Sequence, residues 1–181
     1  MNFSLHFVAW HSRRVRHYLA DPEWRTYLGF VGIIAVIISL ALIEQDVYGV
    51  SDSIRKGFFQ SVSIATTTGF STDNFSVWPT FLPFLLLMSA FIGACGGSAG
   101  GGIKVIRVLL LYKQGVREIM RLIHPNAVIP IKLGRKPVGS RVVEAVWGFL
   151  AAYVLVFALL MLVVMAIGED PITAYSVVGS A

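Results

Sequence analysis

Residues 66–70 read Thr66-Thr67-Thr68-Gly69-Phe70, and this polar run with its single glycine stands between two long apolar stretches of the chain. Apolar residues recur at helical spacing just before it and predict a short helix from about Asp52 to Ala65. Ser51 and Asp52 are the candidate N-caps of that helix. The helix is much shorter than a membrane-crossing helix, which needs about 20 residues. The order of apolar stretch, short helix, polar run and apolar stretch decides the fold.

Three runs of the sequence carry no charged residue: Thr26–Ile43, Asn74–Ile103 and Ala145–Gly168. The 181-residue chain is 56% hydrophobic and 14% charged, whereas a soluble domain carries roughly a quarter charged residues. Core helices of a large soluble protein usually keep a polar stripe, and a signal peptide ends in a cleavage site. Neither feature is evident here. We therefore predict an all-α membrane protein in which the first and third runs each form one membrane helix.

The basic residues indicate how the chain is oriented in the membrane. Of 15 lysines and arginines, four precede the first run, two lie between the first and second runs, and nine lie between Lys104 and Arg141. Because positive residues stay on the cytoplasmic side, we predict that the N-terminus and the 104–141 connection are cytoplasmic. The 44–78 connection and the C-terminal end are then periplasmic. Residues 1–24 mix aromatic side chains with arginine and histidine, which predicts an amphipathic helix along the inner membrane surface.

The 66–70 run has the parts that an ion filter needs. An ion that crosses a membrane exchanges its hydration shell for oxygens of fixed geometry, and the carbonyls of an extended backbone provide them. Gly69 can adopt a positive φ, and the preceding helix would direct the negative end of its dipole toward a cation. The same residue types also form ordinary outer loops. The residues alone therefore leave a pore segment and a plain loop both open.

The middle apolar run contains a second unusual segment, from Gly93 to Gly102. Six of these ten residues are glycine, and each glycine costs a helix about 1 kcal/mol relative to alanine. We expect one helix from about Pro79 to Ile92, an unwound stretch, and a second helix from about Lys104 to Arg121. Broken helices of this kind mark ion or substrate pathways in transporters. Close helix packing and a phosphate-binding loop are the alternatives, although phosphate loops usually follow a strand.

Three motifs carry a family resemblance: Ser63-Ile-Ala-Thr-Thr-Thr-Gly-Phe-Ser-Thr72, Phe91-Ile-Gly-Ala-Cys-Gly-Gly-Ser-Ala-Gly-Gly-Gly-Ile-Lys-Val-Ile-Arg107 and Val143-Glu-Ala-Val-Trp-Gly-Phe149. Together they resemble the TrkH branch of the TrkH/KtrB family of potassium transporters, over essentially the whole chain. The resemblance implies a potassium-channel-like fold with four membrane–pore–membrane repeats around a single ion path. Residues 24–112 then look like the third repeat, and residues 142–181 like the opening of the fourth.

The resemblance also implies roles for the two unusual segments. Thr66 to Phe70 fall on a selectivity filter with Gly69 as its signature glycine. The expected ligands of potassium, the transported ion, are the carbonyls of Thr67, Thr68, Gly69 and Phe70. The second segment becomes a mobile gate loop beneath the filter, formed by Gly93, Gly96, Gly97, Ser98, Gly100, Gly101 and Gly102. At its inner end Lys104 and Arg107 either impede cations or anchor the helix at the interface, and the sequence leaves this open.

The predicted organisation has four parts. Residues 1–23 form a cytoplasmic or interfacial segment, 24–112 the complete repeat, 113–141 a basic cytoplasmic connector, and 142–181 the first membrane helix of a truncated next repeat. Asp170-Pro171 has the form of a helix start and predicts the beginning of another pore helix. Since one repeat cannot surround an ion, we expect the chain to be a fragment of a longer protein.

The predicted function is potassium uptake across the bacterial cytoplasmic membrane. A non-conducting membrane scaffold is the alternative. An enzyme is not expected, because the sequence has no nucleophile–base pair and no metal-ligand spacing, and neither a bound cofactor nor nucleic acid is expected. The resemblance implies a homodimer and a cytoplasmic nucleotide-binding regulatory subunit (TrkA-like) that docks on the basic connector. Anionic membrane lipid would explain the same charges on that connector.

Overall fold

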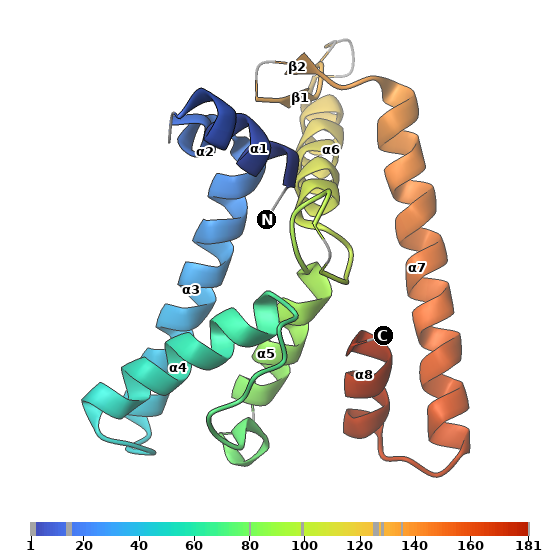
Figure 1. The fold of residues 1–181 in the computed structure, drawn as a ribbon. Helices are drawn as coiled ribbons and strands as arrows, with labels where there is room; N and C mark the ends of the chain where they lie inside the picture. Colours follow the sequence, from blue (N-terminus) through green and yellow to red (C-terminus); the bar gives the residue numbers. More distant parts are fainter. Residues whose placement is uncertain are drawn as a thin grey trace.

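Two long helices flank a helix that is broken in the middle of its course (Figure 1). The computed structural model describes residues 3–13, 16–79, 81–98, 100–124, 127, 129–134 and 136–180. Its helices are α1 Phe3–Ser12, α2 Arg16–Ala20, α3 Pro22–Glu44, α4 Val50–Ala65, the 3-10 helix η1 Phe75–Val77, α5 Phe81–Ile92, α6 Val105–Ile123, α7 Ser140–Ala166 and α8 Pro171–Ser180. Two short strands, β1 Lys132–Leu133 and β2 Lys136–Pro137, form an antiparallel pair.

The helices α3 and α7 are the membrane-crossing helices expected from the first and third apolar runs. They contain 23 and 27 residues, and both are long and apolar enough to span a bilayer. The start of α3 is well defined, because the Asp21 carboxylate accepts hydrogen bonds from the backbone N–H groups of Glu23 (2.7 Å) and Trp24 (3.2 Å), and Pro22 opens the helix. The predicted spans are therefore confirmed as helices.

The short helix before the polar run is α4, which crosses α3 obliquely (Figure 1). It ends at Ala65 as predicted, but Ser51 and Asp52 are not its N-caps. The N-cap is Gly49, whose carbonyl accepts from the N–H of Ser53 at 2.9 Å. The helix thus begins two residues earlier than predicted, and Asp52 lies in the first turn, where a carboxylate also favours the helix dipole.

Close contact between α3 and α4 depends on a glycine. A Cβ atom placed on Gly57 would lie 2.6 Å from the Ser39 hydroxyl and 3.1 Å from the Ser39 Cα. On both sides of Ser39 along the helix, α3 also packs on α5 through a core of buried side chains, which comprises Ile34, Ile38, Ala41, Leu42, Trp78, Leu82 and Leu86. This core fixes the two membrane helices of the repeat around α4.

The second membrane helix of the repeat is broken as predicted. It runs as α5 to Ile92 and resumes as α6 at Val105, and the segment between them is not helical. The observed starts and ends lie within two residues of the expected ones. The predicted fold, an all-α membrane repeat with a glycine-rich break, agrees with the structure except for the two-stranded hairpin.

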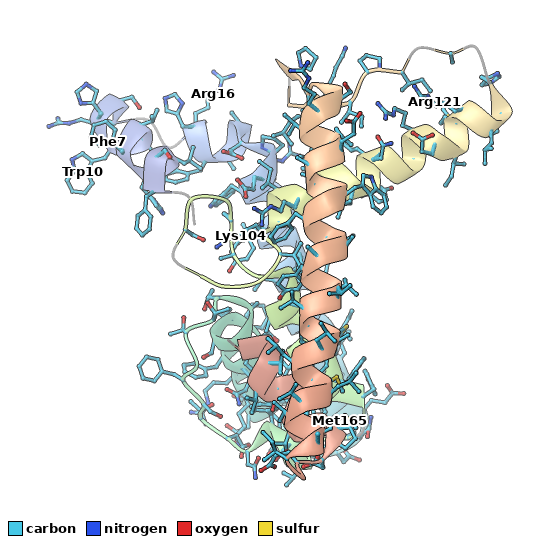
Figure 2. The ribbon with its side chains drawn as sticks, turned by 90° about the vertical axis from the view of Figure 1, so that its right-hand side faces the viewer. Phe7, Trp10, Arg16, Lys104, Arg121 and Met165 are labelled. Atoms are coloured by element: carbon cyan, nitrogen blue, oxygen red, sulfur yellow. The ribbon has the colours of Figure 1, made fainter. Side chains whose placement is uncertain are left out.

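That hairpin and the N-terminal segment depart from the sequence expectations. Residues 1–24 were expected to form one amphipathic helix, but the described part contains two short helices and the start of α3. The apolar side chains of α1 do not share one face, and Phe7 and Trp10 extend away from the other helices (Figure 2). In the connector, Leu133 packs beside a buried cluster of Leu110, Ile131, Val143 and Val146 that joins α6 to α7.

The chain after α7 turns back toward α5. Asp170 caps α8 as predicted, because its carboxylate accepts from the Thr173 hydroxyl at 2.6 Å and from the Thr173 N–H at 3.3 Å. Phe91 at the end of α5 lies 4.6 Å from the ring centroid of Phe157 in α7 and 5.7 Å from that of Tyr175 in α8. These aromatic contacts hold α8 beside the repeat, where Figure 1 shows it between α5 and α7.

Candidate functional site

The 66–70 segment leaves α4 as a tight turn and continues as irregular backbone. The N–H groups of Thr67 and Thr68 donate to the carbonyls of Ile64 (3.0 Å) and Ser63 (2.9 Å) and close the end of the helix. Thr67 has a φ of +55° and Gly69 a φ of +80°. A threonine rarely adopts this region, and glycine adopts it at no steric cost. The segment is thus turned sharply at two points, and the predicted role of Gly69 as the flexible position fits its conformation.

The carbonyl groups of this segment are used unequally. The Ser63 hydroxyl donates to the carbonyl of Phe70 at 2.5 Å. Within the part of the chain that the structure describes, no hydrogen bond reaches the carbonyls of Thr67, Thr68 or Gly69. A backbone carbonyl without a partner needs water or an ion. Three consecutive carbonyls are therefore available at the C-terminal end of α4, where the helix dipole is negative.

Polar side chains bond the residues that follow the 66–70 segment to α4. The Gln60 side chain is fully buried, and its Nε2 donates to the Ser71 hydroxyl (2.7 Å) and to the Asp73 carbonyl (3.0 Å). The Ser63 bond to Phe70 lies one turn further along the same helix. Sequence analysis missed Gln60. The available signal was one long polar residue on a buried face of α4 that is otherwise made of small residues, serine, glycine and alanine.

An ion pair joins α4 to the residues that follow the 66–70 segment. Lys56 Nζ lies 2.8 Å from Asp73 Oδ2, and the Tyr48 hydroxyl donates to the same oxygen at 2.5 Å. Trp78 Nε1 donates in turn to the Tyr48 hydroxyl at 3.3 Å. These bonds lower the pKa of Asp73 from its usual 3.8 to about 2, mainly through the hydrogen bond from Lys56, and they raise the pKa of Lys56. Residues before, within and after α4 are thereby joined around the loop.

The glycine-rich loop, Gly93–Gly102, is compact. The N–H of Ile103 donates to the Phe91 carbonyl at 3.0 Å, and the N–H of Val105 donates to the Ala94 carbonyl at 3.2 Å, so the two ends of the loop are bonded to each other. Gly102 has a φ of +79°, and a Cβ atom there would lie 2.8 Å from the Phe91 carbonyl oxygen. Only glycine allows this approach. The described part of the loop comprises residues 93–98 and 100–102.

The loop lies directly against the 66–70 segment. A Cβ atom on Gly100 would lie 3.1 Å from the Thr67 hydroxyl and 3.7 Å from the Thr66 carbonyl oxygen. A buried cluster that includes Ala65, Cys95 and Val105 joins the end of α4 to both sides of the loop. The structure therefore brings together the two segments that the sequence singled out separately.

A cavity of about 380 Å³ adjoins the same place. It is lined by Thr67 and Gly69 of the segment, by Leu87 and Ala90 of α5, and by residues of α8 that include Tyr175. Thr67 and Gly69, whose carbonyls have no hydrogen-bond partner among the described residues, thus share this cavity with α8.

Lys104 and Arg107 take different positions. Lys104 Nζ donates to the carbonyl oxygens of Ser98 (3.2 Å) and Gly100, so its ammonium group holds the loop itself (Figure 2). The guanidinium of Arg107 lies 3.7 Å from the centroid of the Phe149 ring and ties α6 to α7. Sequence analysis proposed cation repulsion or interfacial anchoring for both residues and did not foresee either contact.

Glu23 is a further residue at the loop that sequence analysis missed. It lies in the first turn of α3, is 5% exposed, and accepts a hydrogen bond from the N–H of Gly96. An acidic residue in a first helical turn ordinarily indicates only a favourable dipole interaction. No local pattern connects it to a loop more than 70 residues later.

Comparison with known proteins places this arrangement in a family. A sequence model of the TrkH family, described as a cation transport protein, matches residues 3–179. The Trk system potassium uptake protein TrkH of Halomonas elongata is 52% identical over 179 residues, which cover 99% of this chain and 37% of that protein. TrkH of Escherichia coli K12 is 51% identical over 176 residues, covering 97% of this chain and 36% of that protein.

A solved structure agrees with the sequence comparison. The crystal structure of the potassium transporter TrkH from Vibrio parahaemolyticus matches with a TM-score of 0.93 and 47% identity, over 99% of this chain and 39% of that chain. The chain therefore spans somewhat more than a third of the length of the relatives that it matches. Its membrane helix–pore loop–membrane helix repeat is the fold of these transporters. The chain belongs to the TrkH family of cation transport proteins.

Proposed function

We propose that this chain forms one complete pore repeat, and the opening of the next, in a protein that takes up potassium across the bacterial cytoplasmic membrane. The observation that carries the proposal is the row of open carbonyls at Thr67, Thr68 and Gly69, which lies at the negative end of α4 and has the glycine-rich loop directly beneath it. Relatives at about half identity are named as potassium uptake proteins.

The proposed ion site uses the carbonyls of residues 67–70. Potassium loses part of its hydration shell on entering the pore, and carbonyl oxygens replace the lost water. The carbonyl of Phe70 also accepts from Ser63, which leaves one lone pair for an ion and fixes the direction of the group. A single repeat supplies one side of such a site, so the remaining oxygens come from other repeats.

The glycine-rich loop is the proposed gate. Gly100 lies against Thr66 and Thr67, so an ion leaving the filter toward the cytoplasm meets the loop first. Lys104 adds a positive charge bound to the loop carbonyls, which raises the electrostatic barrier to a cation while the loop is in place. Conduction then requires that the loop moves and that Lys104 moves with it.

The setting of the repeat is part of the proposal. We place the N-terminus and the 104–141 connection in the cytoplasm, and the 44–78 connection and the C-terminal end in the periplasm, because of the distribution of basic residues. A homodimer, anionic lipid and a nucleotide-binding regulatory subunit are the proposed partners, the last on the basic connector at 113–141.

A non-conducting membrane scaffold is the second candidate. The small residues at the α3–α4 contact, such as Gly57 against Ser39, allow close helix packing, which a scaffold needs as much as a pore does. The two functions differ at Gly69, because a scaffold has no use for the direction of its carbonyl.

Potassium flux into liposomes that contain the protein carrying this sequence tests the proposal, with Gly69→Ser as the variant. Gly49→Ser is the matched control: it makes the same substitution at the other end of α4, where a Cβ atom meets nothing within 4 Å. We expect Gly69→Ser to retain flux and to lose preference for potassium over sodium, while Gly49→Ser keeps both. Unchanged selectivity in a folded Gly69→Ser protein would favour the scaffold.

A further inference from the structure

We propose that Glu23 is the positioning residue of the glycine-rich loop. Its carboxylate, projecting from the first turn of α3, holds the loop beneath the 66–70 segment through the N–H of Gly96. The inference deepens the proposed function, since it rests on the loop acting as a gate, and it names the side chain that keeps that gate in its closed position.

The geometry joins two distant parts of the chain. Glu23 and Gly96 are 73 residues apart, and the side chain of Glu23 is buried. A Cβ atom on Gly96 would lie 3.4 Å and 3.8 Å from the two carboxylate oxygens and 3.3 Å from a side-chain methyl of Ile106. Gly96 thus lies against both the Glu23 carboxylate and the first turn of α6.

Helix capping does not account for this arrangement. Asp21 already caps α3, because it accepts from the N–H groups of Glu23 and Trp24. A carboxylate that served only the helix dipole could remain in solvent. Glu23 is buried instead, and a buried charge is costly unless it is hydrogen-bonded. If the loop moved away, the buried carboxylate would lose its hydrogen bond from the N–H of Gly96. The free-energy cost of that loss favours the loop position seen here.

A residue of opposite charge holds the other half of the loop. Lys104 Nζ donates to the carbonyls of Ser98 and Gly100, whereas Glu23 accepts from the N–H of Gly96. The loop is therefore clamped by an anion on its N–H side and by a cation on its carbonyl side. Removing Glu23 releases the half that contains Cys95 and leaves the Lys104 contacts in place.

Cys95 allows the release to be measured independently of transport. It is the only cysteine in this sequence and is 2% exposed, packed with Ala65 and Val105. The experiment measures the rate at which a small maleimide modifies Cys95, in a protein where it is the sole cysteine, together with basal potassium flux in liposomes. The variants are Glu23→Ala, Glu23→Gln and Glu23→Asp. Glu44→Ala is the matched control, since it removes the exposed glutamate at the opposite end of α3.

We expect Glu23→Ala to raise the modification rate of Cys95 by about tenfold or more, in line with the strength of a hydrogen bond to a charged group. Glu23→Gln keeps a hydrogen-bond acceptor but loses the charge, so its Cys95 modification rate should lie between those of the wild type and Glu23→Ala. Basal flux should rise in the same order. Glu44→Ala should match the wild type in both measurements.

Two outcomes separate this inference from the function on which it rests. Faster modification of Cys95 with unchanged flux would uphold the positioning role of Glu23 and contradict the gating role of the loop. Wild-type modification of Cys95 in the Glu23 variants would overturn the inference. If Glu23→Ala does not fold, Glu23→Asp decides, because it keeps the charge and withdraws the carboxylate by one methylene group. A wild-type labelling rate in Glu23→Asp would then overturn it.

Discussion

The carboxylate of Asp73 lies 2.8 Å from the ammonium group of Lys56, so the chain that leaves the 66–70 segment is bonded back to the helix that enters it. The Tyr48 hydroxyl binds the same carboxylate oxygen, and the Lys56 ammonium lies 3.6 Å from the centroid of the Tyr48 ring. An ion filter needs carbonyls that keep their direction. This outer clasp, Tyr48, Lys56 and Asp73, limits how far the segment can move away from α4.

The clasp predicts an acid-sensitive contribution to stability. The pKa of Asp73 is lowered to about 2 in the folded protein, so its contribution is present above the usual carboxyl pKa and is lost as the pH falls through the folded value. In detergent, the thermal unfolding midpoint of the wild type should be higher than that of Asp73→Asn. This difference should be constant from about pH 5 to 8 and should disappear toward pH 2.

Asp52→Asn is the control for this measurement. Asp52 also pairs with a basic residue, Arg55, but the pair is exposed on the surface of α4, and such pairs contribute little. An advantage over Asp73→Asn that survives unchanged at pH 2, or that already fades between pH 6 and 8, would contradict the assignment.

A second prediction concerns the Ser63 hydroxyl, which fixes the direction of the Phe70 carbonyl. Ser63→Ala removes one hydrogen bond, worth about 0.5–1.5 kcal/mol. Preference for potassium over sodium in liposome flux should therefore fall by up to about tenfold. Ser61→Ala is the matched control, because the Ser61 hydroxyl donates at 2.7 Å to the Gly57 carbonyl within its own helix and not to the 66–70 segment. Equal selectivity in the two variants would show that this bond does not shape the filter.

Local patterns allowed much of this fold to be predicted. The end of α4 at Ala65, the break between Ile92 and Val105, and the cap at Asp170 each depend on residues close in sequence, and the structure agrees with all three. The start of α4 was predicted wrongly, because Ser51 and Asp52 are good caps by type, but the chain already turns into the helix at Gly49.

The contacts that connect the two unusual segments could not be predicted in this way. Gly100 meets Thr67, and Glu23 meets Gly96, across more than 30 and 70 residues. Such pairs are set by how α3, α5 and α6 pack, and one sequence contains no periodic signal for them. The β1–β2 hairpin was missed for a related reason: two-residue strands are too short to show an alternating pattern.

A third prediction tests the contact between α3 and α4. Gly57→Ala would place a methyl group 2.6 Å from the Ser39 hydroxyl and 3.1 Å from the Ser39 backbone. Overpacking of this kind costs about 1–3 kcal/mol, so the thermal unfolding midpoint in detergent should fall. Gly29→Ala in α3, where a Cβ atom meets nothing within 4 Å, should leave the midpoint unchanged or raise it, because alanine favours a helix. A Gly57→Ala protein as stable as Gly29→Ala would contradict the close approach of the two helices.

The fourth prediction separates contact with the filter from the general flexibility of the loop. Gly100 and Gly101 are adjacent, and neither has a positive φ. A methyl group on Gly100 would lie 2.6 Å from Ala94 Cβ and 3.1 Å from the Thr67 hydroxyl, whereas one on Gly101 meets nothing within 4 Å. Both alanine variants stiffen the loop by a similar amount, but only Gly100→Ala places a methyl group against Ala94 and Thr67.

If the loop closes the path by lying against the 66–70 segment, basal potassium flux should rise about tenfold in Gly100→Ala. A tenfold rise corresponds to a shift of about 1.4 kcal/mol in the equilibrium between the closed and open positions of the loop. Gly101→Ala should conduct like the wild type. Equal flux in the two variants would mean that transport responds to the stiffness of the loop or not to the loop at all. A rise only in Gly100→Ala would show that transport depends on how tightly Gly100 packs between Ala94 and Thr67.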